Sequence, residues 1–353
     1  MANIYRKGGQ SMSCKRIGQD TIRFTRPPVF RAWANCGGKM EAQGPLASSF
    51  DTLEPDSFFG EKTWEAAESA MQIRCLSQAL KKGGLTADRL SLAFGGDLLN
   101  QCTGTSFAMR HHGVPFCGVY SACASMGESL LLAAMSVASG AALSAAAMAS
   151  SHYCTAERQY RTPLPYGSQR APTAQWTATA CGCCVLTAEG GGPRVTAAVP
   201  GRVTDLGLTD SCNMGAAMAP AAYHTISAYF RDTGEGPGDF DCILTGDLGK
   251  FGHALLIELF RRDGVDLTKN YTDCGLLLYD IEGQDMHCGG SGAGCSAAVL
   301  AGYLLGKLAA DRWRRILFAP TGALLSPTSV FQGESIPGIC HAVVIESGKE
   351  AQS

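Results

Sequence analysis

The sequence is poor in charge: Asp, Glu, Lys and Arg make up only 17 % of its 353 residues, and the formal net charge is −2. No basic run exceeds RWRR at 312–315, so nothing indicates nucleic acid as a partner. The N-terminus has basic residues but no apolar stretch after them, so it does not resemble a secretory signal peptide. We therefore expect an intracellular protein in which residues 1–21 form a loosely ordered leader.

Metal-binding and disulfide patterns are also missing. The sixteen cysteines, in a long chain without a signal peptide, indicate a reducing compartment. Cys181, Cys183 and Cys184 lie close together, but a strand would send them to opposite faces, and no Cys or His pair follows at zinc-finger spacing. The acidic segment 232–241 lacks the residue order of an EF-hand. We expect no metal site formed by the chain itself.

One uncharged segment, residues 129–151, is long enough to span a bilayer. Its composition is dominated by Ala and Ser rather than Leu and Ile, and Gly140 divides it. We interpret it as a buried helix, a glycine turn and a buried strand, because interior elements of α/β proteins are apolar on every face. The sequence therefore predicts no transmembrane segment.

The chain contains an internal repeat. LSLAFGGDLL and FDCILTGDL each run from an apolar strand into an aspartate, and these two residues, Asp97 and Asp247, are 150 positions apart. A helical stretch, a strand, an Ala-rich helix and two further strands follow in each case. We predict two β-α-β-α-β-β halves, over residues 22–195 and 196–353, with mainly parallel sheets covered by helices.

An amphipathic helix is predicted over residues 62–82, since apolar residues recur there at spacings of three and four. The Gly83-Gly84 pair should end this helix.

Cys123 follows an apolar strand and directly precedes the first Ala-rich helix. A thiol at a helix N-terminus can have a lowered pKa and act as a nucleophile. Cysteine is also a common small buried residue, so the alternative is a residue that only lines a pocket.

Several longer phrases of the sequence resemble the stage V sporulation protein AD family of spore-forming bacteria, a branch of the thiolase superfamily. They span Phe30 to about Glu346 and read GPLASSFD (from Gly44), GEKTWEAAES (Gly60), CTAERQYRTPLPYGSQRAPTAQWT (Cys154), NMGAAMAPAA (Asn213), TGDLGKFG (Thr245) and HCGGSGAGCSA (His287). The resemblance implies a thiolase-like fold, with two pseudo-repeated halves forming a layered α-β-α-β-α sandwich, and a homodimer.

The same resemblance implies a function. Members of the family are understood to bind dipicolinic acid (pyridine-2,6-dicarboxylate) without catalysis, supporting its uptake with calcium into the developing spore and its release at germination. They work beside SpoVA-type membrane proteins, so we expect a peripheral location at the inner membrane of the developing spore. Any Ca²⁺ is expected to arrive with the ligand, and no other cofactor is expected.

Two further functions stay open. An acyltransferase of the ketoacyl synthase type would use Cys123, together with a histidine after a second-half strand and an Asn or His in a later turn. Here that strand ends in TGDLG with Asp247, and the later turn offers only His287 and Cys288, so a non-enzyme is favoured. The third possibility is a docking subunit of a membrane channel complex that binds no small molecule.

A dicarboxylate ligand favours helix N-termini, arginines and hydrogen-bond donors. The segment after the strand that ends near Ser150 supplies several arginines, and Tyr160, Tyr166 or Trp176 could stack on a pyridine ring. The predicted ligand-binding residues are Cys123, His152, Arg158, Arg161, Asp247 and His287.

Overall fold

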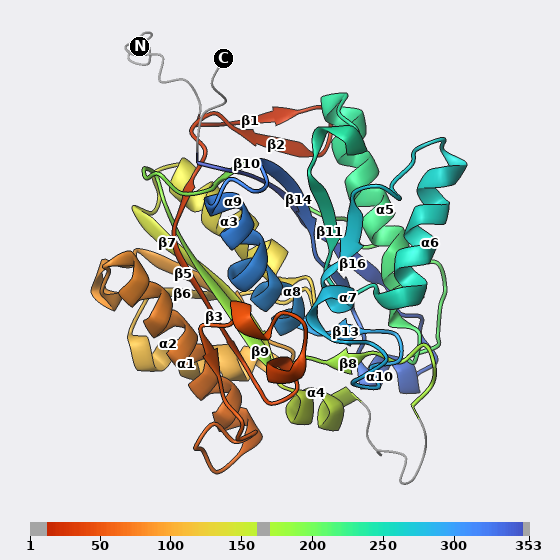
Figure 1. Cartoon of the computed structure of the whole chain (residues 1–353), viewed down its shortest axis with the longest axis horizontal. Helices are drawn as coiled ribbons and strands as arrows, with labels where there is room; N and C mark the ends of the chain where they lie inside the picture. The colour runs from red at the N-terminus through yellow and green to blue at the C-terminus, as the bar shows by residue number, and fades with distance from the viewer. Residues whose placement is uncertain (1–12, 161–169, 349–353) are drawn as a thin grey trace, which may run out of the picture.

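The computed structural model describes residues 13–160 and 170–348, and it shows two α/β halves side by side (Figure 1). The main strands of the first half are β3 (Val29–Gly37), β5 (Leu92–Gly96), β6 (Phe116–Gly118), β7 (Ser144–Ser151) and β9 (Ala180–Thr187). Those of the second half are β10 (Arg194–Val199), β11 (Cys242–Thr245), β12 (Tyr271–Asp273), β14 (Arg315–Ala319) and β17 (Ala342–Glu346).

The two halves share one topology. The strand order is β6-β5-β7-β9-β3 in the first and β12-β11-β14-β17-β10 in the second. In each order the first two pairings are parallel and the next two antiparallel. A short antiparallel contact between β3 and β10 joins the two sheets. The internal repeat is thus confirmed, although the predicted β-α-β-α-β-β order omits the first strand and first helix of each half.

Helices form three of the five layers (Figure 1). The helices α1 (Trp64–Gly83) and α2 (Thr103–His112) cover the outer face of the first sheet, and α5 (Met214–Thr233) and α6 (Gly249–Arg262) cover that of the second. Between the sheets lie α3 (Ser125–Ala138) and α8 (Ala293–Val299), the latter continuing through the π-helical turn η6 (Leu300–Leu304) into α9 (Leu305–Ala309). This is the predicted α-β-α-β-α arrangement.

Smaller elements complete the chain. They are β1 (Cys14–Ile17), β2 (Thr21–Phe24), β4 (Thr52–Leu53), α4 (Tyr153–Tyr160), β8 (Trp176–Thr177), α7 (Cys274–Leu278), β13 (Gly290–Ser291), β15 (Thr321–Ala323), α10 (Pro327–Phe331) and β16 (Gly338–Cys340). The 3-10 turns are η1 (Glu41–Gln43), η2 (Ala47–Ser49), η3 (Ala87–Arg89), η4 (Asn100–Cys102) and η5 (Pro237–Asp239). Since β1 pairs with β2 in the predicted leader, residues 14–21 are structured there, whereas residues 1–12 lie outside the described chain.

The two local predictions are confirmed. Helix α1 begins where the Thr63 hydroxyl accepts a hydrogen bond from the amide of Ala66, and it ends at Gly84, whose φ of 63° suits glycine. The uncharged segment 129–151 contains α3, a turn at Gly140 with φ of 78°, and the fully buried strand β7. No helix in the described ranges combines the length and apolar character that crossing a membrane requires.

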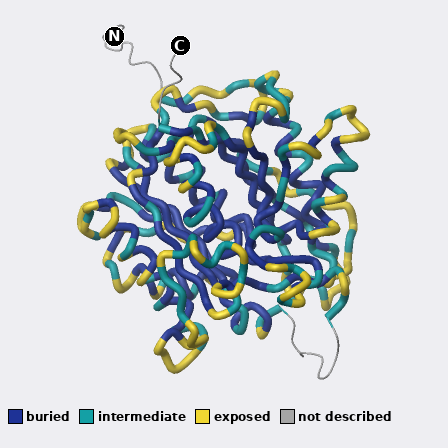
Figure 2. Tube along the Cα trace, in the orientation of Figure 1, coloured by how far each residue is buried: buried dark blue, intermediate teal, exposed yellow. Residues whose placement is uncertain are grey.

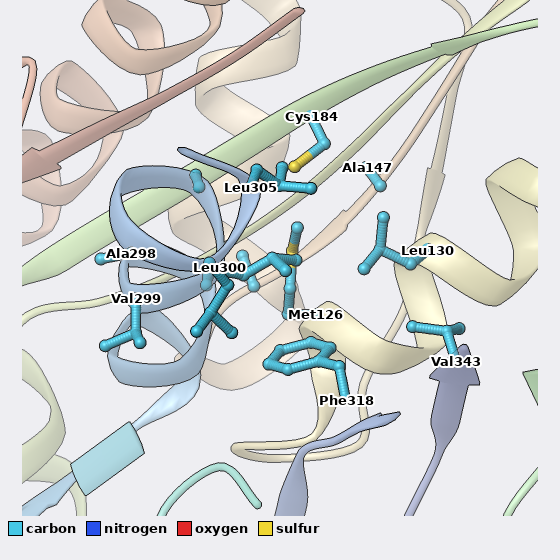
Figure 3. Close-up of a cluster of buried hydrophobic side chains, with 14 of the residues drawn as sticks. Met126, Leu130, Ala147, Cys184, Ala298, Val299, Leu300, Leu305, Phe318 and Val343 are labelled. Atoms are coloured by element: carbon cyan, nitrogen blue, oxygen red, sulfur yellow. The ribbon is translucent and has the colours of Figure 1, made fainter. Parts of the chain in front are cut away.

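The central layer holds the largest part of the core (Figures 2 and 3). Met126 and Leu130 of α3 point toward the α8–α9 side, where Leu300 and Leu305 lie. Both sheets add side chains to this cluster, for example Cys184 from the first and Phe318 from the second. Both halves therefore contribute to one continuous core.

Close backbone packing accompanies this arrangement. A Cβ on Gly182 of β9 would lie 2.0 Å from the carbonyl oxygen of Ala297 in α8, and one on Gly294 of α8 would lie 2.0 Å from that of Ala180 in β9. Such distances are far below van der Waals contact, so only glycine permits α8 to lie directly on β9.

We predict that Gly182→Ala lowers the free energy of unfolding by about 1–3 kcal/mol, because overpacking forces the backbone of α8 away from β9. Chemical denaturation measures this value. Gly306→Ala is the matched control: Gly306 lies in α9 with open space around its Cβ position, so this variant should be as stable as the wild type or slightly more stable. Equal stability of both variants would contradict the close packing.

Candidate functional site

A pocket of about 620 Å³, its open mouth included, lies above Cys123 and is lined by both halves. The first half contributes Leu98, Tyr120, Ala122, Cys123, Ala156, Glu157, Tyr160 and Thr177. The second half contributes Ser211, Cys212, Met214, Ser291, Ala323 and Leu325. Among the lining residues that the structure describes, Glu157 is the only one of the types Asp, Glu, Lys and Arg.

Cys123 lies at the base of the pocket, two residues before α3, and is 7 % exposed. Its Sγ is 3.9 Å from the Ser291 hydroxyl. Burial and the neighbouring Asp247 carboxyl raise the pKa of the Cys123 thiol well above its usual value. Of the two alternatives for Cys123, this direction favours a residue that lines the pocket, because desolvation and a nearby acid outweigh the helix N-terminus.

Asp247 is fully buried and held by donors from separate segments. Oδ2 accepts hydrogen bonds from the Ser291 hydroxyl at 2.9 Å and the Gly292 amide at 3.2 Å, while Oδ1 accepts one from the Thr321 hydroxyl at 3.0 Å. Burial raises the pKa of Asp247 to about 7. The structure thus brings together two of the predicted site residues, Cys123 and Asp247.

This pair differs from the cysteine and histidine that acyl transfer commonly uses. A cysteine nucleophile needs a base that takes its proton, and none of the described residues that line the pocket is a histidine or a lysine. The carboxyl of Asp247 raises the thiol pKa, and once ionised it would repel a developing oxyanion. The site offers a polar, largely neutral base for a ligand.

Two tyrosines form the wall at the side of α4. The Tyr160 hydroxyl donates to the carbonyl of Leu98 at 2.5 Å, and the hydroxyls of Tyr120 and Tyr160 are 2.6 Å apart. Tyr160 is among the aromatic residues predicted to face a ring-shaped ligand, and it does line the pocket. Trp176 instead stacks on Tyr153 with ring centroids 4.1 Å apart, and Tyr166 lies outside the described residues.

The other predicted ligand-binding residues lie elsewhere. His152 is buried, with Nε2 2.8 Å from the carbonyl of Ser57 and Nδ1 accepting from the amide of Cys154. His287 lines a separate surface hollow, where Nδ1 is 2.9 Å from the carbonyl of Ala171.

Arg158 lies on the outer side of α4, where its guanidinium pairs with Glu65 and covers the ring of Trp64. The helical period explains this, since Ala156, Glu157 and Tyr160 face the pocket and Arg158 points away. Arg161 lies outside the described residues.

Several residues of the pocket and of the surroundings of Asp247 were not found from the sequence. Ser291 and Thr321 donate to the carboxyl of Asp247, and the Gln175 amide donates to its backbone carbonyl, yet these three residues lie far apart along the chain. Ser211 and Cys212 come from a loop without regular structure. No local spacing links these segments. Within the described ranges, no group of three metal-binding side chains occurs.

We predict that Cys123 resists alkylation. In native protein treated with iodoacetamide at neutral pH, peptide mass spectrometry should show label on the exposed Cys117 and Cys212, but little on Cys123. Cys212 is a matched control because it lines the same pocket. After denaturation all three should react. Labelling of native Cys123 at the rate of Cys212 would show a reactive thiolate and contradict the raised pKa.

Comparisons with known proteins identify the family of this chain. Residues 18–346 match the family described as stage V sporulation protein AD. The stage V sporulation protein AD of Bacillus subtilis (strain 168) is 39 % identical over 332 residues, which cover 94 % of this chain and 98 % of the relative.

Solved condensing enzymes share the fold at low sequence identity. The 3-oxoacyl-[acyl-carrier-protein] synthase III of Aquifex aeolicus VF5 aligns with a TM-score of 0.56 at 12 % identity, covering 90 % of this chain and 99 % of that enzyme. A variant of OleA from Xanthomonas campestris aligns with a TM-score of 0.58 at 13 % identity, covering 94 % and 100 %. The fold is thus thiolase-like, and the chain belongs to the stage V sporulation protein AD family, a family of sporulation proteins.

Proposed function

We propose that the pocket above Cys123 binds dipicolinic acid without catalysis and that the protein supports uptake of this ligand into the developing spore and its release at germination. The observation that carries the proposal is the pairing of a protonated Cys123 with Asp247 in a family member whose fold is that of condensing enzymes. A site with a protonated thiol and no neighbouring base is better suited to holding a ligand than to acylation.

The shape and chemistry of the lining suit a flat aromatic dicarboxylate. Tyr120 and Tyr160 offer ring surfaces for a pyridine, while Ser211 offers a hydroxyl group for a carboxylate oxygen. The described lining contains the carboxyl group of Glu157 and no lysine or arginine. A ligand whose charge is reduced by bound Ca²⁺ would therefore fit better than the free dianion, so we propose that calcium accompanies the ligand.

Calorimetric titration with dipicolinate, with and without Ca²⁺, tests the proposal. We predict one site per chain, and at least about tenfold weaker binding for Leu325→Trp, which fills the pocket from the rim. Leu143→Trp is the control, because Leu143 is 83 % exposed and does not line the pocket. No binding by the wild type under either condition would contradict the proposed ligand, and equal loss in both variants would contradict the proposed pocket.

An acyltransferase is the second candidate, favoured by the fold of the condensing enzymes and by Cys123 at the base of the pocket. It predicts a covalent acyl adduct on Cys123 after incubation with acyl-CoA, visible as an increased mass of its peptide. The binding proposal predicts no adduct, and Cys123→Ala should then weaken dipicolinate binding little.

We further propose that the protein acts beside SpoVA-type membrane proteins, peripherally at the inner membrane of the developing spore. Family membership supports this location. If the chain served only as a docking subunit, it would co-purify with these membrane proteins but give no heat with dipicolinate. Binding and docking together would support both parts.

A homodimer is proposed through the edge at β6. This strand ends the first sheet, and the neighbouring helix α2 carries Phe107, which is 49 % exposed. An open strand edge beside apolar surface favours pairing with a second copy. We predict a dimer in sedimentation equilibrium that Phe107→Asp weakens and Leu143→Asp does not. A monomeric wild type would contradict the proposal.

A further inference from the structure

We propose that Glu68 holds a proton in the folded protein and that this proton positions α4, the helix that forms one wall of the pocket. Glu68 lies on α1, on the far side of α4 from the ligand, and does not line the pocket. It is therefore a positioning residue. The inference about the pocket rests on the proposed function, whereas the inference about the proton does not.

Hydrogen bonds around Glu68 run in one direction. The Gln72 amide donates to the Ser150 hydroxyl at 2.7 Å, and Ser150 donates to Oε1 of Glu68 at 2.8 Å. The Thr155 hydroxyl is 3.0 Å from Oε2 of Glu68 and also 3.0 Å from the carbonyl of His152. Thr155 has one hydroxyl proton, so it cannot donate fully to both oxygens.

A proton on Oε2 removes the need for Thr155 to donate to two oxygens. Glu68 then donates to the Thr155 oxygen, and Thr155 donates to the carbonyl of His152 in the first turn of α4. The result is a continuous series from Gln72 through Ser150 and Glu68 to α4. Gln72 and Glu68 lie on α1, and Ser150 lies on β7. Thr155 lies on α4, and His152 directly precedes that helix.

A second buried acid makes an ionised Glu68 costly. Asp97, which follows β5, receives hydrogen bonds from the amides of Leu99 and Thr105 and from the Thr105 hydroxyl, so it is the carboxyl better suited to carry the charge. The Cβ position of Gly104 is 3.2 Å from Oδ2 of Asp97 and 3.3 Å from Cγ of Glu68, which places those two atoms within about 6.5 Å of each other.

The surroundings of Glu68 supply no compensating cation. On β9, the titratable group near Glu68 is the buried thiol of Cys181. On the β5 side, the titratable group near Glu68 is the carboxyl of Asp97. Its partners on β7 and α4, Ser150 and Thr155, are neutral. Among the described residues, no lysine, arginine or histidine pairs with Glu68. Burial and the charge of Asp97 raise the pKa of Glu68 to about 8.

The proton connects to the pocket through sequence neighbours. Thr155 directly precedes Ala156 and Glu157, and Tyr160 ends the same helix, so three lining residues depend on how α4 is seated. Removing the proton turns the Thr155 hydroxyl toward Glu68 and places a second negative charge beside Asp97. The hydrogen bond from Thr155 to an ionised Glu68 still joins α4 to α1, but the bond from Thr155 to the carbonyl of His152 is lost and two buried carboxylates repel each other. These two costs disturb the seating of α4, so the pocket should bind its ligand less tightly above about pH 8.

The sign of the stability effect follows from the raised pKa. The contribution of Glu68 to stability is fully present below its unfolded pKa of 4.5 and is lost as the pH rises through about 8. Glu68→Gln keeps a donor for Thr155 and an acceptor for Ser150 but cannot ionise. Its melting temperature should therefore exceed that of the wild type by a margin that grows between about pH 5 and about pH 9.

The experiment compares three proteins over this pH range by thermal unfolding and by dipicolinate titration. Glu65→Gln is the matched control, since Glu65 lies on the same helix at the surface and pairs with Arg158. We expect all three proteins to lose some affinity as Asp247 ionises near pH 7, and wild type and Glu65→Gln to lose severalfold more than Glu68→Gln between about pH 7 and about pH 9.

Parallel melting profiles for wild type and Glu68→Gln would show that Glu68 carries no titrating proton and would overturn the inference. A growing difference in melting temperature without dipicolinate binding by any of the proteins would support the proton and reject the proposed ligand.

Thr155→Val offers a second test, because valine can neither accept the proton of Glu68 nor donate to the carbonyl of His152. This substitution is introduced into the wild type and into Glu68→Gln, and ligand affinity is measured for both from about pH 7 to about pH 9. If the hydrogen bonds run as described, the smaller loss of affinity of Glu68→Gln at high pH should disappear once Thr155→Val is present. Retention of that advantage would contradict the role of Thr155.

Discussion

The close approach of the central helices to the two sheets is the constraint on which the rest of the structure depends. Gly182 and Gly294 allow the backbones of β9 and α8 to touch, and larger side chains from both sheets fill the space that remains around α3 and α9. This packing fixes where α3 begins and where β13 ends. Cys123 and Ser291 consequently face each other across the two halves at 3.9 Å.

The same burial decides the chemistry at the base of the pocket. A thiol and a carboxyl removed from water both favour their neutral forms, so Cys123 and Asp247 have raised pKa values. The two repeated aspartates differ in their partners. Asp97 follows β5 and receives two backbone amides and a hydroxyl from nearby residues, whereas Asp247 receives three donors from two later segments of the second half, at 291–292 and at Thr321.

Much of the fold could be predicted because its signals are local or repeated. The helix over 62–82, the buried segment 129–151 and the paired aspartates all follow from spacing and composition. The predicted repeat left out the first strand and the first helix of each half, since it was recognised only from the aspartate strands onward, and the helix over 62–82 was predicted separately from its own spacing. At the site, Cys123 and Asp247 were found from the two halves, whereas Ser291 and Thr321 meet only after folding. Arg158 was misplaced relative to the pocket because the helical phase of α4 could not be determined from a loop-like segment.

The pocket has a buried carboxyl group at its base and another behind its α4 wall. Asp247 at the base and Glu68 behind α4 are both buried carboxyl groups with pKa values raised to about 7 and about 8. A condensing enzyme would place a base beside the thiol, and burial would then have to be offset by charge stabilisation during the reaction. Here the buried acids hold protons and hydrogen bonds in fixed positions. Below about pH 7 these protonated acids stabilise one arrangement of the pocket, and their ionisation above that pH disturbs it. A fixed, neutral arrangement suits the proposed binding of a small molecule better than the activation of a nucleophile.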